Sequence, residues 1–471
     1  MQPSRGCGAF LEAKPSNIGC PSRQSIWIGW NDFGTEHGTC THRPFPLITT
    51  LMDTPTIPAT RIAVIMPNWL GDAVMATPFL RALRGLYPHA DIMAMHNRLV
   101  SPVLAGLPFV NSAQPYAVEA GGKPDIAASA RLLAAHKADL AILLPNSFRS
   151  AWLAWRAGIP RRLGYAREYR RALLTDVLYP QRRTPQERAA HAARMAEIRR
   201  IRAEGNRSSQ EGGAAATEPG PLPRRVLRRD FQPLPTIDYY LALAHYLERE
   251  SAELKAITEH DDVRRMELGL TTAEIDEAQN SLTAQGIPAD APLALLFPGA
   301  NFGASKCWMP ERFAQVARDL ARPGGPWRMT VLIGGSPAEK PLVDAILAAL
   351  PQVASVSPVS GPSAPRVMAL GNFNNSAGVS LGAVKALVAR SRLMVCNDTG
   401  PRHFAVAFNI PVVTLLGPTD PRWAETFFQQ ERQIQIPVPC GPCQLKTCPI
   451  DHRCMQRIEP ERVLEKIAEI L

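Results

Sequence analysis

A carboxylate follows the first long apolar run of the chain and stands where a helical pattern begins. Asp72 comes directly after Gly71, within the stretch NWLGD (68–72). A carboxylate at such a place can take the proton from an attacking hydroxyl group, and the glycine lets a ligand approach the backbone. Acidic residues also cap helices. The sequence therefore leaves two roles open for Asp72, general base or helix cap.

Small residues, a hydroxyl group and a lysine gather in the stretch PGANFGASKCWMP (298–310), ahead of a predicted helix. Gly299 follows Pro298 at its start, and Ser305 and Lys306 lie near its middle. Backbone N–H groups near a helix N-terminus, together with a lysine charge, suit a diphosphate group. A surface turn with an incidental lysine would have the same sequence pattern. The spacing of the glycines and the lysine is not that of a Walker loop.

A third candidate loop, NDTGPRH (397–403), joins an apolar run to a helical pattern. Thr399 and Gly400 can offer hydroxyl and N–H donors to a phosphate, and Asp398 and His403 flank them. Beside such a turn, a binding role for His403 is favoured over a purely structural one. Glu339, after the stretch IGGSPA, could accept hydrogen bonds from ribose hydroxyls or cap a helix.

Each of these loops follows a short apolar run of the kind that forms a strand buried on both faces of a parallel sheet. Helical patterns separate the runs, and this alternation occurs in two series along the chain. The first series is RIAVIMP (61–67), DIMAMHN (91–97), DLAILLPNS (139–147) and RRLGY (161–165); the second is PLALLFPGA (292–300), MTVLIGGSP (329–337), RLMVCNDTG (392–400) and PVVTLLGPT (411–419). We therefore predict an α/β protein with two Rossmann-like, doubly wound parallel sheets, with ligands beyond the carboxyl ends of the strands.

The length of 471 residues also favours two domains. We expect a disordered N-terminal extension over 1–58, a first Rossmann-like domain over 59–260 and a second over 261–471. The sequence has no run of eighteen apolar residues and no recognisable secretory signal. A cytoplasmic location is the expectation.

The net charge of +10 is concentrated in one segment, 181–229, which holds 12 arginines and 5 glutamates. Its stretch EGGAAATEPGPLP lacks apolar periodicity, so we predict a disordered insertion in the first domain. Such a segment could bind acidic lipid headgroups or nucleic acid. A solvated insertion with helical propensity near 188–202 is the favoured interpretation.

Four of the nine cysteines cluster in PCGPCQLKTCPIDHRC (439–454), separated by two, four and five residues. A structural zinc site, reduced thiols and a regulatory disulfide all fit this irregular spacing. In each case the cluster would brace the second domain and take no part in catalysis. The last helical pattern, EPERVLEKIAEIL (459–471), is expected to pack back across the two domains.

Four segments together resemble the ADP-heptose:lipopolysaccharide heptosyltransferases, most of all the heptosyltransferase II branch. They are GDAVMATPFLRALR (71–84), LPNSFRSAWLAWRAGIPRRLGY (144–165), PGANFGASKCWMP (298–310) and NDTGPRHFAVAFNIPVVTLLGPTDP (397–421). The resemblance covers 61–180 and 265–430. It implies a GT-B fold and an inverting, metal-independent transfer of heptose from ADP-heptose to the inner core of lipopolysaccharide, without a cofactor. The Arg-rich insertion, the N-terminal extension and Cys307 depart from the family pattern.

The resemblance also implies roles for individual residues. Asp72 matches the catalytic base and Lys306 the lysine that binds the donor diphosphate. The donor-binding turn is matched by Asp398, Thr399, Gly400 and His403, and an acceptor-facing loop of the first domain by Asn146, Ser147 and Arg149. With Gly71, Gly299, Ser305 and Glu339, these residues are the candidate site. The implied partners are a nucleotide-sugar donor and a lipopolysaccharide-core acceptor, with peripheral association at the inner membrane and no nucleic acid.

Two other functions fit parts of the sequence. A nucleotide-sugar epimerase of the same architecture would need a further acid–base pair near the sugar ring, and no such pair stands out. A non-catalytic protein could bind polysaccharide or nucleic acid through the basic segment 181–229.

Overall fold

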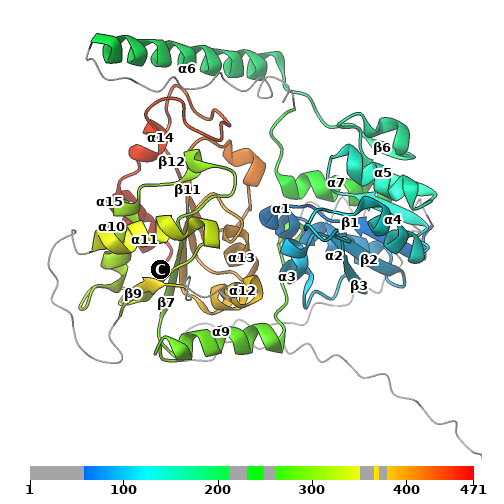
Figure 1. Cartoon of the computed structure of the whole chain (residues 1–471), viewed down its shortest axis with the longest axis horizontal. Helices are drawn as coiled ribbons and strands as arrows, with labels where there is room; N and C mark the ends of the chain where they lie inside the picture. The colour runs from blue at the N-terminus through cyan, green and yellow to red at the C-terminus, as the bar shows by residue number, and fades with distance from the viewer. Residues whose placement is uncertain (1–57, 212–230, 249–260, 351–364, 371–378) are drawn as a thin grey trace, which may run out of the picture. The chain divides into compact units, whose positions relative to one another are not determined.

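The computed structural model describes residues 58–211, 231–248, 261–350, 365–370 and 379–471. The first lobe is built on a parallel sheet of six strands in the order β3-β2-β1-β4-β5-β6 (Figure 1). The strands are β1 (Arg61–Ile65), β2 (Asp91–His96), β3 (Ser112–Pro115), β4 (Leu140–Leu143), β5 (Arg161–Tyr165) and β6 (Asp176–Leu178). The chain reverses its direction across the sheet between β1 and β4, and this is the position where doubly wound sheets bind ligands.

The second lobe repeats this plan with the order β12-β11-β10-β7-β8-β9, again with parallel pairs only. Its strands are β7 (Leu293–Phe297), β8 (Thr330–Ile333), β9 (Val367–Ala369), β10 (Leu393–Asn397), β11 (Val412–Leu416) and β12 (Glu431–Gln435). The prediction of two doubly wound parallel sheets is confirmed. The extension predicted as disordered lies outside the described residues up to position 57.

Helices cover both faces of each sheet. Those of the first lobe are α1 (Leu70–Met75), α2 (Thr77–Leu86), α3 (Ser101–Leu104), α4 (Ile126–Ala135), α5 (Phe148–Arg156) and α7 (Thr236–Glu248). Those of the second are α9 (Thr272–Ala284), α10 (Pro310–Ala321), α11 (Lys340–Ala349), α12 (Leu381–Arg390), α13 (Arg402–Ala407), α14 (Arg453–Gln456) and α15 (Pro460–Ala468).

The side chains of β7 show how the second core is divided. Leu295 packs on the side of α12 and α13, while Ala294 and Leu296 pack on the side of α10 and α11. Figure 1 shows these two helix pairs on opposite sides of the sheet. Because alternate side chains of a strand point to opposite faces, a strand covered on both sides must be apolar throughout. All five residues of β7 are buried accordingly.

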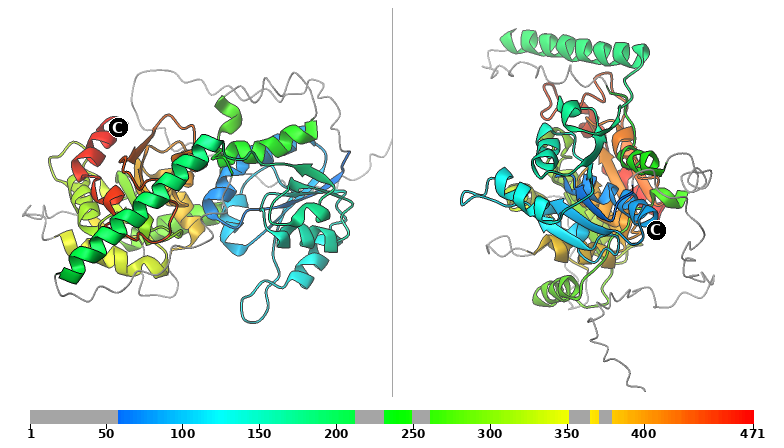
Figure 2. Two further views of the ribbon diagram at one scale, coloured as in Figure 1. Left: turned by 90° about the horizontal axis from the view of Figure 1, so that it is seen from above. Right: turned by 90° about the vertical axis from the view of Figure 1, so that its right-hand side faces the viewer.

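The Arg-rich insertion was expected to be disordered over 181–229, with helical propensity near 188–202. The helical propensity is confirmed, and the disorder is wrong for 185–211. Residues Pro185–Glu211 form one long helix, α6, which Figure 2 shows running beside the second lobe. Met195 and Ile198 on this helix are buried in the same core cluster as Cys440 and Cys443. The helix forms because these residues, one turn apart, give it an apolar side. Positions 212–230 lie outside the described residues.

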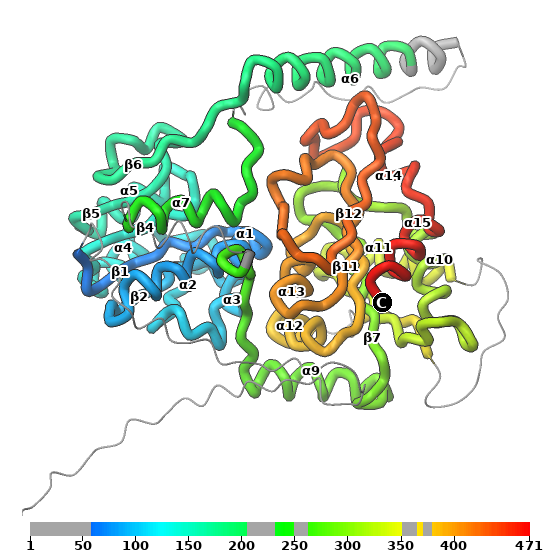
Figure 3. The backbone as a smooth tube through the Cα atoms, turned by 180° about the vertical axis from the view of Figure 1, so that it is seen from behind, coloured from blue at the N-terminus to red at the C-terminus, as the bar shows by residue number. Residues whose placement is uncertain are grey.

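The two lobes are joined through α9, and Figure 3 follows the chain from this helix into β7. The segment before α9 passes close to the first lobe: a Cβ atom on Gly269 would lie 2.2 Å from the carbonyl oxygen of Gly106. Lys385 of α12 is fully buried and donates to the carbonyl oxygen of Pro102 over 2.7 Å. Backbone of the first lobe therefore meets side chains of the second.

The last helix differs from its prediction. α15 packs against α10, β11 and β12 of the second lobe and not across the two lobes. Its buried residues Val463 and Ile467 lie one turn apart and join the second-lobe core, which accounts for this position. Within the described ranges, no helix is both long enough and apolar enough to cross a membrane.

Candidate functional site

Asp72 lies in the first turn of α1, directly beyond the carboxyl end of β1. The N-cap position belongs to Trp69, which makes no side-chain cap. The Asp72 side chain is half-buried and has no hydrogen-bond partner among the described residues. Of the two roles that the sequence left open, the cap is not formed. The carboxylate is free to bind a ligand.

Burial raises the pKa of Asp72 to about 6. The positive charge of Lys306 acts in the opposite direction, and the negative charge of Asp398 adds to the increase. Both of these residues belong to the second lobe, so the carboxylate of the first lobe lies within their electric field. A carboxylate with a pKa near neutrality suits general-base chemistry, because it is ionised at neutral pH and still accepts a proton readily.

Lys306 and Asp398 form a buried ion pair. Lys306 closes the short helix η5 (Ala304–Lys306), and its Nζ lies 2.6 Å from Oδ2 of Asp398 and 4.8 Å from the ring centre of Phe302. The structure thus brings together the two loops that the sequence assigned to the diphosphate group. Lys306 approaches Asp398 from the loop after β7, and Asp398 follows β10.

The negative charge of Asp398 is held by several neighbours. Although burial acts to raise its pKa, Lys306 and Arg402 hold the pKa of this carboxyl well below its usual range. Thr419 also donates to Oδ2 over 2.8 Å. Arg402 is fully buried and forms a bidentate pair with Glu431 of β12, with distances of 2.5 and 2.9 Å. The turn after β10 is therefore fixed by charges before any ligand binds.

His403 lies at the junction of the two lobes. Its ring contacts the backbone of the first lobe, since a Cβ atom on Gly71 would stand 2.7 Å from its Cδ2. Burial, with a further contribution from Arg402, lowers the pKa of His403 to about 3. Its Nδ1 atom is buried and has no hydrogen-bond partner in the part of the chain that the structure describes. The imidazole is neutral at physiological pH and can bind a ligand only as a neutral donor or acceptor.

Substitution of Gly71 by alanine tests this close approach. A methyl group at Gly71 would overlap the His403 ring, and such overpacking typically lowers the free energy of unfolding by about 1–3 kcal/mol. We expect the Gly71→Ala variant to melt at a lower temperature and to bind donor more weakly, because His403 must move. Gly121, whose Cβ position is open, provides the matched control: Gly121→Ala should leave both properties unchanged. A fully active Gly71→Ala enzyme would contradict the contact.

Three other candidate residues of the second lobe already have partners inside the protein. The Ser305 hydroxyl donates to the carbonyl oxygen of Leu445 over 2.6 Å, so it braces the 440–454 segment. Glu339 forms a capping box with Ser336, accepting from its backbone N–H over 2.7 Å. This is the capping role that the sequence left open. Gly299 faces Glu339 so closely that a side chain would overlap the carboxylate.

The acceptor-facing candidates lie after β4 in the first lobe. Ser147 caps α5, and its hydroxyl oxygen accepts from the Ser150 backbone N–H over 3.3 Å. Oδ1 of Asn146 accepts from the Tyr239 hydroxyl over 2.9 Å. Arg149 is exposed. Asn146 and Ser147 lie in the loop after β4, and Arg149 lies in the first turn of α5. Their contact with an acceptor stays a prediction.

Sequence reasoning missed the residues that hold the site in place. Arg402 and Glu431 were not singled out, although Arg402 lies within the quoted NDTGPRH stretch. Thr419 was recognised only as part of a following strand and loop. No local signal marks Glu431, because its partner is far away in the sequence. For Arg402 the sequence did hold one hint of a buried charge: it is a charged residue within the apolar pattern that follows Gly400.

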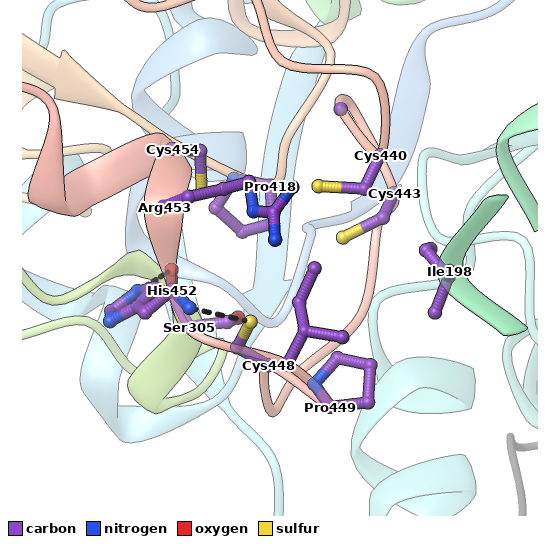
Figure 4. Close-up of a pocket in the computed structure, with 12 residues that line it drawn as sticks. Ile198, Ser305, Pro418, Cys440, Cys443, Cys448, Pro449, His452, Arg453 and Cys454 are labelled. Carbon is purple, nitrogen blue, oxygen red and sulfur yellow. Dashed lines mark hydrogen bonds between the residues drawn. The ribbon is translucent and has the colours of Figure 1, made fainter. Parts of the chain in front are cut away.

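The four clustered cysteines line a pocket together with His452 and Arg453, and Ile198 of α6 faces them (Figure 4). All four are free thiols. Burial raises the pKa of Cys443 to about 11 and that of Cys454 to about 12, so these two are protonated at neutral pH. Within the described part of the chain, no three His, Cys, Asp or Glu side chains are arranged to hold a metal ion. The cluster packs α6 against the second lobe.

A family model decides the class of protein. The model of glycosyltransferase family 9 (heptosyltransferase) matches residues 126–194 and 252–453, which is more than half of the chain. The chain belongs to glycosyltransferase family 9. This glycosyltransferase is 27% identical over 421 residues to lipopolysaccharide heptosyltransferase 2 of Escherichia coli, covering 87% of this chain and 98% of that relative. It is 25% identical to lipooligosaccharide heptosyltransferase 2 of Haemophilus influenzae, covering 87% and 99%.

Solved structures agree with this assignment. The structure of the Escherichia coli ADP-heptose lipopolysaccharide heptosyltransferase II superposes with a TM-score of 0.60 at 26% identity, covering 87% of this chain and 98% of that one. The Escherichia coli heptosyltransferase WaaC, solved with ADP-2-deoxy-2-fluoro heptose, gives a TM-score of 0.51 at 16% identity and shares the fold. The glycosyltransferase thus has a GT-B fold and acts on a nucleotide-sugar donor, and the epimerase alternative is not favoured.

Proposed function

We propose that this glycosyltransferase transfers heptose from ADP-heptose to the inner core of lipopolysaccharide, with inversion and without a metal ion. One observation carries the proposal. The carboxylate of Asp72 in the first lobe has no hydrogen-bond partner among the described residues and lies in the electric field of Lys306 and Asp398 in the second lobe. The names of its relatives support heptose as the sugar and lipopolysaccharide as the acceptor.

In this proposal each lobe supplies one half of the reaction. Asp72 takes the proton from the acceptor hydroxyl as that oxygen attacks the anomeric carbon from the face opposite the diphosphate, which inverts the configuration. The departing diphosphate carries negative charge, and Lys306 stabilises it, with donors from the Thr399–Gly400 turn. Asp398 holds Lys306 in position through the 2.6 Å contact. Fixed charges stabilise a transition state without reorganisation during the reaction.

The raised pKa of Asp72 predicts how the rate depends on pH. A general base works only when it is ionised, so kcat/KM should fall as the pH drops through about 6 and level off above it. Rate measurements between pH 4.5 and 8.5 at low donor concentration check this. A Lys306→Met variant, which lacks the nearby positive charge, should shift the midpoint upward in whatever activity remains. A midpoint near pH 4 would place Asp72 in open solvent and contradict its role.

The direct test of the function is a transfer assay with purified full-length enzyme. We expect heptose to move from ADP-heptose to a lipopolysaccharide core that lacks its outer heptose, in the presence of EDTA. ADP-glucose and UDP-sugars serve as control donors. Melting temperatures measured with ADP, UDP and GDP give an independent readout, because a ligand that binds only the folded state raises the melting temperature. Stabilisation by UDP and not by ADP would overturn the choice of donor.

A lipopolysaccharide acceptor is anchored in a membrane. Peripheral association with the cytoplasmic face of the inner membrane is therefore part of the proposal, and no nucleic-acid partner is. The exposed aromatic side chains Trp69, Phe148 and Tyr169, all after strands of the first sheet, support a membrane-proximal position of the first lobe. Sedimentation with anionic lipid vesicles tests the association.

A further inference from the structure

The charges around the turn after β10 cancel among themselves. Lys306 and Arg402 are the two cations that act on Asp398, and Arg402 also pairs with Glu431. Two positive side chains therefore face two negative ones. Asp72 of the first lobe adds a third carboxylate to the same electric field, and this carboxylate is ionised at neutral pH. The network carries an excess of negative charge before any ligand binds.

A diphosphate group brings further negative charge to this place. Such a charge is costly to take out of water unless cations and N–H donors match it. In the proposed function Lys306 faces the diphosphate, but its ammonium group is already shared with Asp398 at 2.6 Å. A second cation beside Lys306 would restore the balance.

Lys446 is a cation that meets this requirement. Its Nζ atom lies over the ring of Phe302, 6.0 Å from the ring centre, and Nζ of Lys306 lies over the same ring at 4.8 Å. The negative face of an aromatic ring attracts both ammonium groups. The Lys446 side chain is exposed, and its ammonium group forms no hydrogen bond or ion pair with the residues that the structure describes. Its charge, in contrast to that of Lys306, is free for a ligand.

Other basic side chains near this turn are already committed. His403 is neutral, because burial lowers its pKa to about 3. Arg422, on the loop after β11, pairs with Asp420 at 2.8 Å and with Glu187 at 3.3 Å. Neither side chain can add a free positive charge to the one that Lys306 supplies.

The backbone of Lys446 is fixed against the loop after β7. Its carbonyl oxygen accepts from the Ser305 backbone N–H over 3.2 Å, and a Cβ atom on Gly303 would lie 2.3 Å from the same oxygen. The Ser305 hydroxyl donates to the carbonyl oxygen of Leu445 over 2.6 Å, and Nε2 of His452 donates to the carbonyl oxygen of Ser305 over 2.7 Å (Figure 4). The side chain of Lys446 therefore starts from a fixed point beside the donor loop, although it is exposed.

We propose that Lys446 is a second cation that binds the donor diphosphate, together with Lys306. The inference rests on the proposed function, because it adds a ligand to the same donor site. It also explains why the cysteine segment 440–454 is braced against the loop after β7: the segment carries Lys446. As the diphosphate leaves the anomeric carbon and gains negative charge, both ammonium groups stabilise it.

The binding of ADP and of adenosine separates the phosphate contacts from those of the base and the ribose. Calorimetry is carried out in EDTA and in Mg²⁺ with the full-length wild-type enzyme, Lys446→Met and Lys446→Arg. We expect Lys446→Met to bind ADP about tenfold more weakly, as for the loss of one hydrogen bond to a charged group, with unchanged affinity for adenosine. Lys446→Arg keeps the charge and should retain most of the affinity for ADP.

Turnover gives a second readout. At saturating ADP-heptose, kcat of Lys446→Met should fall, because the charge on the leaving group grows in the transition state. Its melting temperature without ligand should equal that of the wild-type enzyme, since the side chain is exposed. Lys123→Met is the matched control. Lys123 is an exposed lysine of the first lobe, and its loss removes the same charge without changing kcat or the affinity for ADP.

The outcomes distinguish this inference from the proposed function. Equal affinity for ADP in Lys446→Met and the wild-type enzyme would overturn the role of Lys446. An equal loss of affinity for ADP and adenosine would also overturn it, because the substitution would then have disturbed the loop. Affinity for ADP that depends on Mg²⁺ and not on Lys446 would assign the missing charge to a divalent cation. In each of these cases the function stands. If the wild-type enzyme transfers no heptose while ADP binding depends on Lys446, the function fails and the role of Lys446 is upheld.

Discussion

Replacement of Asp72 by asparagine should abolish sugar transfer while leaving the protein folded and able to bind ADP. The side chain has no hydrogen-bond partner among the described residues to lose, and asparagine has nearly the same shape. Removal of a general base typically slows a reaction by about 10²- to 10⁴-fold. The measurement is kcat at saturating donor and acceptor, with the affinity for ADP taken from calorimetry. Because a half-buried carboxylate without a hydrogen-bond partner is replaced by a neutral amide, the melting temperature should stay the same or rise slightly.

A matched control keeps this experiment specific. Glu119 is an exposed carboxylate of the same lobe, and Glu119→Gln removes the same charge from a residue that is not among those acting on the pKa of Asp72. Its turnover should equal that of the wild-type enzyme. Substantial activity in Asp72→Asn would show that another group takes the proton, and the assignment of the base would then be wrong.

The largest loss of stability is expected for Arg402→Met. Arg402 is 0% exposed and balances Glu431 and Asp398, so its removal leaves two buried carboxylates short of a partner. Breaking a buried pair by removing one member typically costs about 3–5 kcal/mol. Chemical denaturation of both proteins measures the difference. We expect donor binding to weaken as well, since Asp398 would no longer hold its place beside Lys306.

Arg200 provides the comparison. Its side chain is 57% exposed, and it pairs at 2.6 Å with Glu204, which is 56% exposed. Exposed pairs are worth about 0–1 kcal/mol, so Arg200→Met should hardly change the free energy of unfolding. A double variant, Arg402→Met with Glu431→Gln, should recover part of the lost stability, because it removes one unpaired charge. Equal effects of Arg402→Met and Arg200→Met would rule out the buried network as a source of stability.

The central part of the fold could be predicted from the sequence, and the edges could not. β1, β4, β7, β10 and β11 are buried on both faces, so their apolar runs are continuous and easy to recognise. The edge strands β3 and β12 read SAQP and ERQIQ, because one side of an edge strand is less covered and polar residues are tolerated there. Such strands carry no pattern that separates them from loops.

The insertion shows a different limit. The sequence predicted disorder for 181–229 with helical propensity near 188–202, but it did not predict that Met195 and Ile198, one turn apart, pack this helix against the second lobe. An apolar side of so few residues is weak evidence in a sequence dominated by arginine and alanine. The two apolar residues of the helix are buried only because they pack against Cys440 and Cys443, which lie some 240 positions later in the sequence. Contacts of this range are not visible in one sequence.

At the site, residue types pointed to the right loops, but pairings needed the structure. The sequence indicated only in general terms that Lys306 and Asp398 lie close together, because both residues follow strands that end at the same edge of a sheet. The partner of Ser305 was not visible, since Leu445 belongs to a distant segment, whereas the cap formed by Glu339 was one of the two roles that the sequence left open.

The neutrality of His403 has a consequence for how the reaction responds to acid. With its pKa lowered to about 3, the imidazole takes up no proton in the range where Asp72 does. The acid side of the rate profile should therefore reflect one ionisation, and log kcat/KM plotted against pH should rise with a slope of about 1. The enzyme would lose activity gradually as the pH falls and would not switch off over a narrow interval.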